Sequence, residues 1–295
     1  MVKPFQFVIF ISAISLHYLP QLMIHSILKD KSTKLFLVLG GFFIANAMIA
    51  EFIGVKIFSL EDTLGISRAN INLFGSKFSF HLTAGVLLWP VVFIMTDIIN
   101  EYYGTRGVKF LSYLAVGLIG YSYLMFMGAI HLKPSEYFTI GNGIDNADNA
   151  YRGIFGQGLW IIIGSMAAFL IGQLLDVLVF HRIKKITGEN RIWLRATGST
   201  LVSQLVDSFV VLFIAFYVGR RVQSNQGEPW TLHQILVTGT GNYIYKFAAA
   251  IILTPVIYII HGWIEKYLGH GLASKMKRSA MSQSDDSFTN IPAAG

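Results

Sequence analysis

The chain has 295 residues, of which 54% are hydrophobic and only 13% are charged. With a mean hydropathy of +0.56, this composition excludes a soluble globular fold, which must cover itself with polar side chains. The net charge of +7 does not indicate a nucleic-acid partner, because the basic residues form short clusters between apolar runs. The lack of cysteine excludes a disulfide framework, thiol catalysis and a cysteine-ligated metal. The composition therefore predicts a membrane protein.

Seven apolar runs have about the length, roughly 20 residues, that a helix needs to cross the hydrocarbon layer. They occupy residues 7–28, 35–58, 83–100, 108–131, 155–180, 198–219 and 235–262. We interpret the first as an extra N-terminal helix or an interfacial segment rather than a signal peptide, because it contains Pro20 and lacks a small-residue cleavage site. The predicted fold class is all-α, a polytopic membrane helix bundle with six core transmembrane helices.

Loop charges predict the orientation of this bundle. The loop 181–195 is strongly basic, whereas the loop 131–153 holds acidic residues among glycine and asparagine. Because cytoplasmic loops are enriched in Lys and Arg, the first loop is predicted to be cytoplasmic and the second external. The C-terminus then lies in the cytoplasm. The pair Arg220 and Arg221 disagrees with this assignment.

The same charges and composition divide the chain into three regions. Residues 1–34 form the N-terminal apolar segment with a basic loop, and residues 35–265 form the six-helix domain. Residues 266–295 are polar and rich in small side chains, so we predict a disordered cytoplasmic tail.

Polar side chains recur inside the predicted spans at helical intervals. They are Asn46, Gln173, Asp176, Ser203, Gln204, Asp207, Asn242 and Lys246. Several continue stripes of small residues spaced by four, such as Gly164, Ala168, Gly172 and Asp176. Polar groups are costly in lipid, so these stripes are expected to face one shared interior. Depth along the helices makes Asp207 the expected partner of Lys246.

One further span carries two carboxylates. Trp89, Phe93, Asp97 and Glu101 fall at intervals of four, which places two rings and two acids along one helix face. Pro90 is expected to kink this helix and free a backbone carbonyl. A ring beside an acceptor is a common arrangement for holding a flat heterocycle.

Structural readings of these groups stay open at this stage. Asp207 and Lys246 could neutralise each other and hold helices together without binding a ligand. Glu101 lies at the boundary and is expected to pair with Arg106 or water. Glu51 is either a charge at the external rim or a group of the site.

Enzyme signatures are absent from the sequence. It contains no G-x-S-x-G, no H-E-x-x-H and no P-loop, and its histidines are not spaced for a metal. We therefore assign no catalytic residue, no metal ligand and no cofactor. A carrier without an ATPase motif must use a gradient, metabolic trapping or a separate subunit.

Four blocks together resemble the queuosine precursor transporter family, also described as a vitamin-uptake-transporter-like family. They are "WPVVFIMTDIINEYYG", "GQLLDVLVFHRIK", "RATGSTLVSQLVDSFVVLFIAF" and "GNYIYKFAAAIILTPVIY". The resemblance implies a non-enzymatic six-helix importer of the inner membrane that carries 7-cyano- or 7-aminomethyl-7-deazaguanine for tRNA modification. It maps the polar positions of the family onto Asn46, Asp97, Gln173, Asp176, Ser199, Asp207, Asn242 and Lys246. A homo-oligomer is left open.

The chemistry of such a ligand agrees with these side chains. Its guanine-like edge offers N–H donors for a carboxylate and a carbonyl for Lys or Gln, which Asp207, Lys246 and Gln204 supply. Its planar ring suits Trp89 or Phe93. Three rivals remain: a carrier of another vitamin or nucleobase, a lipid enzyme with an acid–base pair at the cytoplasmic interface, and a purely structural bundle.

Overall fold

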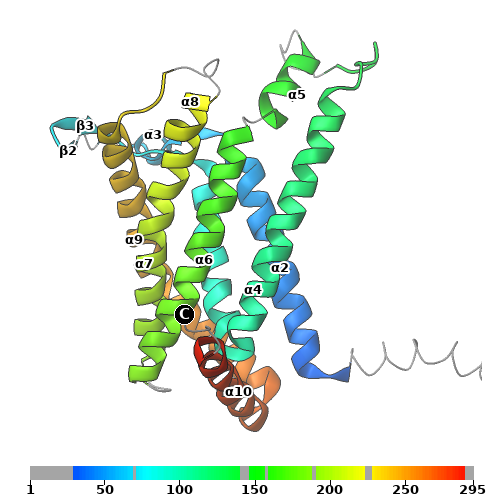
Figure 1. Ribbon diagram of the computed structural model, residues 1–295, viewed down its shortest axis with the longest axis vertical. Coiled ribbons are helices and arrows are strands. Elements are labelled where there is room, and N and C mark those ends of the chain that lie inside the picture. The colour runs from blue at the N-terminus through cyan, green and yellow to red at the C-terminus, as the bar shows by residue number, and fades with distance from the viewer. Residues whose placement is uncertain are drawn as a thin grey trace, which may run out of the picture.

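The computed structural model describes residues 29–68, 71–139, 146–156, 159–187, 191–222 and 228–289. Long helices run side by side through the molecule, short strands gather at one end, and one further helix crosses the other end (Figure 1). The all-α bundle predicted from composition is confirmed. The apolar segment 7–28 lies outside the described residues.

Five helices of the described chain are long and apolar enough to cross a membrane. They are α2 (Lys31–Ile53), α4 (Trp89–Ile130), α6 (Leu159–Thr187), α7 (Ile192–Leu212) and α9 (Leu232–Leu268). Mean hydropathy over their most apolar windows is 1.6 to 2.1. In lipid, a helix must pair its backbone groups internally and present apolar side chains outward. These helices have such apolar outer faces.

Helix α4 folds back on itself. Its 42 residues would extend about 63 Å if straight, roughly twice the hydrocarbon thickness. Gly104 interrupts it with φ 69° and ψ −172°, a conformation that only glycine adopts readily. The Trp89 ring lies 5.4 Å from that of Phe169, and a Cβ at Gly120 would lie 3.7 Å from Met166. Both halves of α4 thus contact the same turn of α6.

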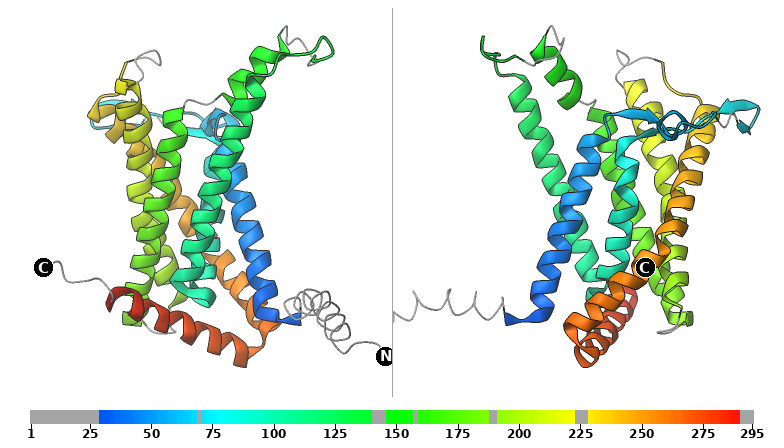
Figure 2. Two further views of the ribbon diagram at one scale, coloured as in Figure 1. Left: turned by 45° about the vertical axis from the view of Figure 1, so that its right-hand side comes forward. Right: turned by 180° about the vertical axis from the view of Figure 1, so that it is seen from behind.

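The fold-back turns one long helix into two antiparallel crossings. In Figure 2 the cyan half descends toward α10 and the green-blue half rises again. The separate predicted spans 83–100 and 108–131 are therefore confirmed as separate crossings. With the other four long helices, the described chain supplies six.

The start of α4 differs from the prediction. The 3-10 turn η1 (Ala84–Leu87) precedes it, and Pro90 stands in its first turn, where no backbone N–H is needed. The predicted kink at Pro90 is wrong for this reason. The span begins later than residue 83 because β4 (His81–Thr83) pairs antiparallel with β1 (Ile57–Ser59).

Short elements cover the end of the bundle that carries these strands (Figure 1). They are α3 (Leu60–Leu64), β2 (Ile71–Leu73), β3 (Ser76–Phe78) and α5 (Ala147–Phe155). The π-helix η2 (Phe213–Val218) and α8 (Gly219–Val222) continue α7 as one span to Val222. Strands β2 and β3 form an antiparallel hairpin. Helix α5 lies within the predicted external loop, so part of that loop is ordered.

Helix α10 (His270–Thr289) lies across the opposite end of the bundle (Figure 2, left). Ala273, Met276 and Ala280 are buried, and Lys277 Nζ lies 2.6 Å from Glu265 Oε1. The prediction of a disordered tail is wrong over this helix. Its apolar positions recur every three to four residues, so one face can pack against the bundle.

Small residues let α6 and α7 approach closely, as the stripe spaced by four predicts. A Cβ at Gly164 would lie 3.1 Å from a carbonyl of α7, and one at Gly172 would lie 3.6 Å from Asp207 Cβ. Ala168 and Asp176 continue the contact and are fully buried. Close approach of these backbones sets the polar side chains of α7 directly against those of α6.

Candidate functional site

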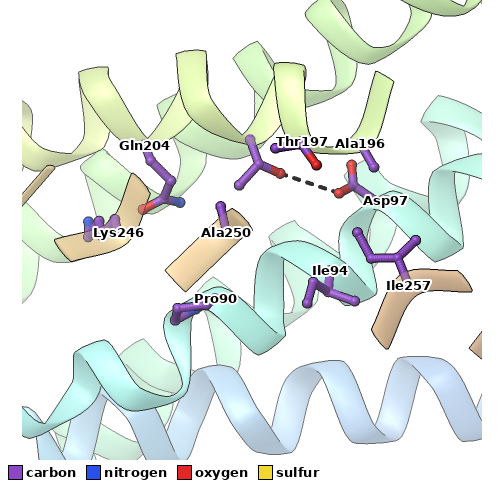
Figure 3. A pocket seen from close by; sticks show the side chains of 10 residues that line it. Pro90, Ile94, Asp97, Ala196, Thr197, Gln204, Lys246, Ala250 and Ile257 are labelled. Carbon is purple, nitrogen blue, oxygen red and sulfur yellow. Dashed lines mark hydrogen bonds between the residues drawn. The ribbon is translucent and has the colours of Figure 1, made fainter. Parts of the chain in front are cut away.

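A small cavity lies between α4, α7 and α9 (Figure 3). Its lining residues are Pro90, Ile94, Asp97, Ala196, Thr197, Thr200, Gln204, Lys246, Ala250 and Ile257. Its walls are mostly apolar with a few polar groups, as in small-molecule pockets. Its free volume of about 20 Å³ holds about one water molecule, so a ligand of nucleobase size requires the surrounding helices to move apart.

The polar groups gather at the two ends of the cavity. Figure 3 shows Asp97 at one end, and Gln204 beside Lys246 at the other. Thr200 stands one helical turn before Gln204 on α7. Eight residues separate Ala196 from Gln204 along that helix, which corresponds to about 12 Å. The polar groups at the two ends are therefore far enough apart to contact opposite ends of one flat molecule.

Gln204 has unused hydrogen-bonding capacity. Its side chain is 4% exposed, yet neither Nε2 nor Oε1 has a hydrogen-bond partner among the described residues. A buried amide without partners costs about 1–3 kcal/mol. An amide that lines a cavity and lacks partners is the arrangement expected of a ligand contact.

Two carboxyl groups meet near the opposite end. Thr200 Oγ1 lies 3.3 Å from Asp97 Oδ2 and 3.4 Å from Asp176 Oδ1. Ser199 Oγ lies 3.4 Å from Asp97 Oδ1, and Ser203 Oγ lies 3.3 Å from Asp176 Oδ1. Asp97 lines the cavity, whereas Asp176 and Ser203 lie behind it. The structure thus brings Asp97, Asp176 and Ser203 together, as predicted.

Lys246 and Asp207 form an ion pair, with 8% and 16% of their side chains exposed. The predicted pairing is confirmed. Lys246 lines the cavity, but Asp207 lies outside the lining residues. The acid therefore holds the lysine, and Asp97 is the carboxylate that faces the cavity.

Besides Asp176, Ser203 and Asp207, three more predicted polar residues lie outside the cavity lining. Thr96 Oγ1 donates a hydrogen bond of 2.8 Å to Gln173 Oε1, which ties α4 to α6. Asn46 donates through Nδ2 to the carbonyl of Phe42 in its own helix, at 2.8 Å. Asn242 is half-buried. The first two of these side chains are engaged within the helix bundle.

The predicted aromatic platform is also outside the cavity. Trp89 packs its ring on Phe169, and Phe93 is buried against the position of Gly172. Pro90 and Ile94 line the cavity instead. A ligand ring would lie against these aliphatic side chains rather than against the two aromatic rings.

Glu101 has different partners from those predicted. Its Oε2 lies 3.0 Å from Lys184 Nζ and its Oε1 lies 2.7 Å from Arg195 Nη2. All three side chains are at most 1% exposed. The expectation of a boundary charge paired with Arg106 or water is wrong, because α10 and the ends of α6 and α7 enclose this position.

Thr200 and Ile94 are site residues that the sequence reasoning did not single out. A signal for Thr200 was present: Ala196, Thr200 and Gln204 are spaced by four and all line the cavity. The stripe through Ser199 and Ser203 obscured it. Ile94 had no comparable signal, because an apolar residue in a membrane helix is expected on any face.

Comparisons with known proteins place this site in a family. Residues 83–260 match the family model described as a putative vitamin uptake transporter. A probable queuosine precursor transporter of Bacillus subtilis is 31% identical over 64% of this chain and 77% of its own length. The queuosine precursor transporter of Escherichia coli is 28% identical over 77% of this chain and 93% of its own length. No solved structure matches the chain.

The matched region includes the whole cavity. Its lining residues run from Pro90 to Ile257, within the 83–260 segment. The long match to the family model and the coverage of these relatives agree with the motifs found in the sequence. The chain belongs to the putative vitamin uptake transporter family, together with the queuosine precursor transporters.

Proposed function

We propose that this protein imports 7-deazaguanine precursors of queuosine, 7-cyano- or 7-aminomethyl-7-deazaguanine, across the inner membrane. The observation that carries the proposal is the cavity between α4, α7 and α9 with unpartnered polar groups, located within the family segment. The names of the relatives supply the substrate class.

The cavity groups complement the edge of a deazaguanine. Asp97 can accept from the ring N–H and amino groups, and Lys246 can donate to the ring carbonyl. Gln204 can donate and accept at once, through the two amide atoms that lack partners. Pro90 and Ile94 cover one face of the flat ring. This assignment gives Asp207 the indirect role of holding Lys246.

The charge distribution supports a cytoplasmic C-terminus. The end of the bundle that carries α10 also holds the start of α2, the bend of α4, the end of α6 and the start of α7 (Figure 2). These segments carry Lys31, Lys34, Arg106, Arg182, Lys184, Lys185, Arg191, Arg195, Lys275, Lys277 and Arg278. Lys and Arg accumulate on the cytoplasmic side of membrane proteins. The strand-bearing end then faces outward; it holds Glu61, Asp62 and Asp148, and also the exceptions Arg220 and Arg221 of α8 (Figure 1).

A lipid-modifying enzyme is disfavoured by the state of Glu101. This reading requires Asp97 and Glu101 to act as an acid–base pair at the membrane surface. Both Glu101 oxygens are instead bound to buried cations. A carboxylate with both oxygens bound to buried cations is not free to contact a lipid substrate.

The test is complementation in a bacterial host that neither makes the precursor nor has its own importer. Expression of this protein should restore queuosine in tRNA at low external precursor. The matched control is Lys246→Met with Gln204→Leu, which should reach the membrane and not restore it. Unchanged tRNA despite confirmed membrane expression of the wild type would overturn the substrate assignment. Restoration that excess adenine or thiamine abolishes would favour a broader nucleobase or vitamin carrier.

A further inference from the structure

The two carboxyl groups at the end of the cavity share one hydroxyl. Asp97 is 2% exposed and Asp176 is fully buried, and Thr200 Oγ1 lies between them at 3.3 Å and 3.4 Å. Two ionised carboxylates that share one hydroxyl repel strongly when little water surrounds them.

The pair has too few donors for two ionised carboxylates. Each hydroxyl has one proton to donate. Ser199 Oγ lies 3.1 Å from the Ala196 carbonyl, closer than its 3.4 Å contact to Asp97. Ser203 Oγ likewise lies 3.0 Å from a carbonyl and 3.3 Å from Asp176. No donor among the described residues reaches Asp176 Oδ2.

The cations near the pair are each bound to another acid. On α6 and α7, Lys184 and Arg195 bind Glu101, one turn beyond Asp97 on α4. On α9, Lys246 binds Asp207. The remaining titratable group nearby on α6, His181, bonds the Asn100 side chain at 2.8 Å through Nε2. In the described part of the chain these contacts leave the Asp97–Asp176 pair without a counter-cation.

We propose that Asp97 and Asp176 together bind one proton and that this proton crosses the membrane with the ligand. The inference rests on the proposed function and adds its coupling ion. A proton on Asp176 supplies the missing donor and leaves Asp97 ionised toward the cavity. Asp97 can then accept the N–H groups of the ligand.

This arrangement links binding of the ligand to binding of the proton. Without the proton, closing the cavity over the ligand would bury two charged carboxylates away from water, and with two protons Asp97 would lose its acceptor character. Ligand binding is therefore strongest with one proton on the pair. When the cavity opens to the cytoplasm, the ligand leaves, water reaches both carboxylates and favours their ionised forms, and the proton is released as well. One neutral ligand and one proton move inward together.

The first experiment tests the proton site without any ligand. Infrared spectra of the purified protein should show the carbonyl band of a buried protonated carboxyl at neutral pH. Asp176→Asn should remove a component of this band that Glu51→Gln leaves in place. The matched control is Glu51→Gln, which removes another intramembrane acid, one that hydrogen-bonds Ser165 at 2.5 Å. A spectrum unchanged by Asp176→Asn would overturn the proton site, even if transport fails.

The second experiment tests coupling in proteoliposomes with radiolabelled 7-cyano-7-deazaguanine and an internal pH dye. An inward proton gradient of one pH unit should raise accumulation by up to about tenfold, and ligand should acidify the lumen. Asp176→Asn should still exchange ligand but lose gradient-driven accumulation, whereas Glu51→Gln should keep it.

The outcomes of the second experiment separate the two proposals. Wild-type uptake that ignores the proton gradient, or follows a sodium gradient instead, overturns coupling and leaves the proposed function standing. No uptake under any gradient overturns the proposed function, and the infrared band then decides the proton site alone. If Asp176→Asn does not fold, dye acidification by the wild type in the presence of ligand decides the coupling.

Discussion

Asp97 and Glu101 stand one turn apart on α4, and both are buried, yet their surroundings are opposite. Glu101 has a cation on each oxygen, at 2.7 Å and 3.0 Å. Asp97 receives only hydroxyl groups, at 3.3 Å and 3.4 Å, and it borders a cavity. Two carboxylates on the same helix thus differ: Glu101 has a cation for each oxygen, whereas Asp97 has an incomplete set of partners.

The difference separates a structural charge from a binding charge. Glu101 joins Lys184 of α6 to Arg195 of α7, and this cluster fixes the ends of three helices. Asp97 keeps acceptor capacity for a molecule that is not part of the protein. A charge inside a membrane is a common mark of function, but here partner count and an adjoining cavity distinguish the two roles.

The largest expected effect on stability comes from the cluster of Glu101, Lys184 and Arg195, which we call the filled Glu101 cluster. Glu101→Ala leaves two buried cations without their acid, which should lower the free energy of unfolding by about 3–5 kcal/mol. The apparent thermal midpoint of the purified protein and the folded fraction in membranes measure this. The control Asp97→Asn strands no cation and should change stability by about 1 kcal/mol or less. A wild-type midpoint for Glu101→Ala would remove the structural role from the cluster.

In its expected contribution to stability, the Lys246–Asp207 pair lies between the filled Glu101 cluster and Asp97. Lys246→Met leaves Asp207 partly buried without its cation, so stability should fall, though by less than for Glu101→Ala. Adding Asp207→Asn should restore much of the stability, because removing both partners of a buried pair is often nearly neutral. Ligand-induced thermal stabilisation should stay absent in the double variant. Normal uptake by a well-folded double variant would return the pair to a structural role.

Gln204 should affect binding without harming the fold. Gln204→Leu removes two ligand contacts, which should weaken binding roughly tenfold to a hundredfold. Stability should be unchanged or higher, because a buried amide without partners is replaced by an apolar side chain. Trp89→Leu is the opposite control: it loses packing on Phe169 and lowers stability but leaves affinity intact. The thermal midpoints of both variants, measured at increasing ligand concentration, test whether Gln204→Leu affects binding alone and Trp89→Leu affects stability alone.

Much of the site was predictable because membrane helices restrict where polar side chains can point. The cost of polarity in lipid assigned Asp97, Gln204 and Lys246 to one interior, and intervals of four placed Asp97 and Lys246 on stripes that face it. They also predicted the partner of Lys246. The error with the aromatic rings came from helix geometry: at about 100° per residue, Asp97 is about 20° from Pro90 but about 80° from Trp89. A spacing of seven locates the cavity face better than two steps of four.

Other features depended on tertiary packing. Lys184 and Arg195 read as cytoplasmic loop charges, and loop charge does not show how deeply a helix end is covered. Low hydropathy favours disorder for the tail, but Ala273, Met276 and Ala280 recur every three or four residues, which is a helix signal in the sequence. The strands between α2 and α4 are short and partly polar, so periodicity alone does not identify them.

The smallest expected effect concerns the attachment of α10, where an ion pair contacts water. Lys277 and Glu265 have 10% and 32% of their side chains exposed, so Lys277→Met should cost about 1 kcal/mol or less. The buried apolar face, with Met276 at its centre, should carry most of the attachment. Because the chain has no cysteine, Ala280→Cys reports on detachment through its labelling rate with a thiol reagent. Lys277→Met should raise this rate by at most about fivefold, whereas Met276→Asp should raise it far more. A larger effect for Lys277→Met than for Met276→Asp would place this ion pair with the filled Glu101 cluster, among the charges that hold the fold.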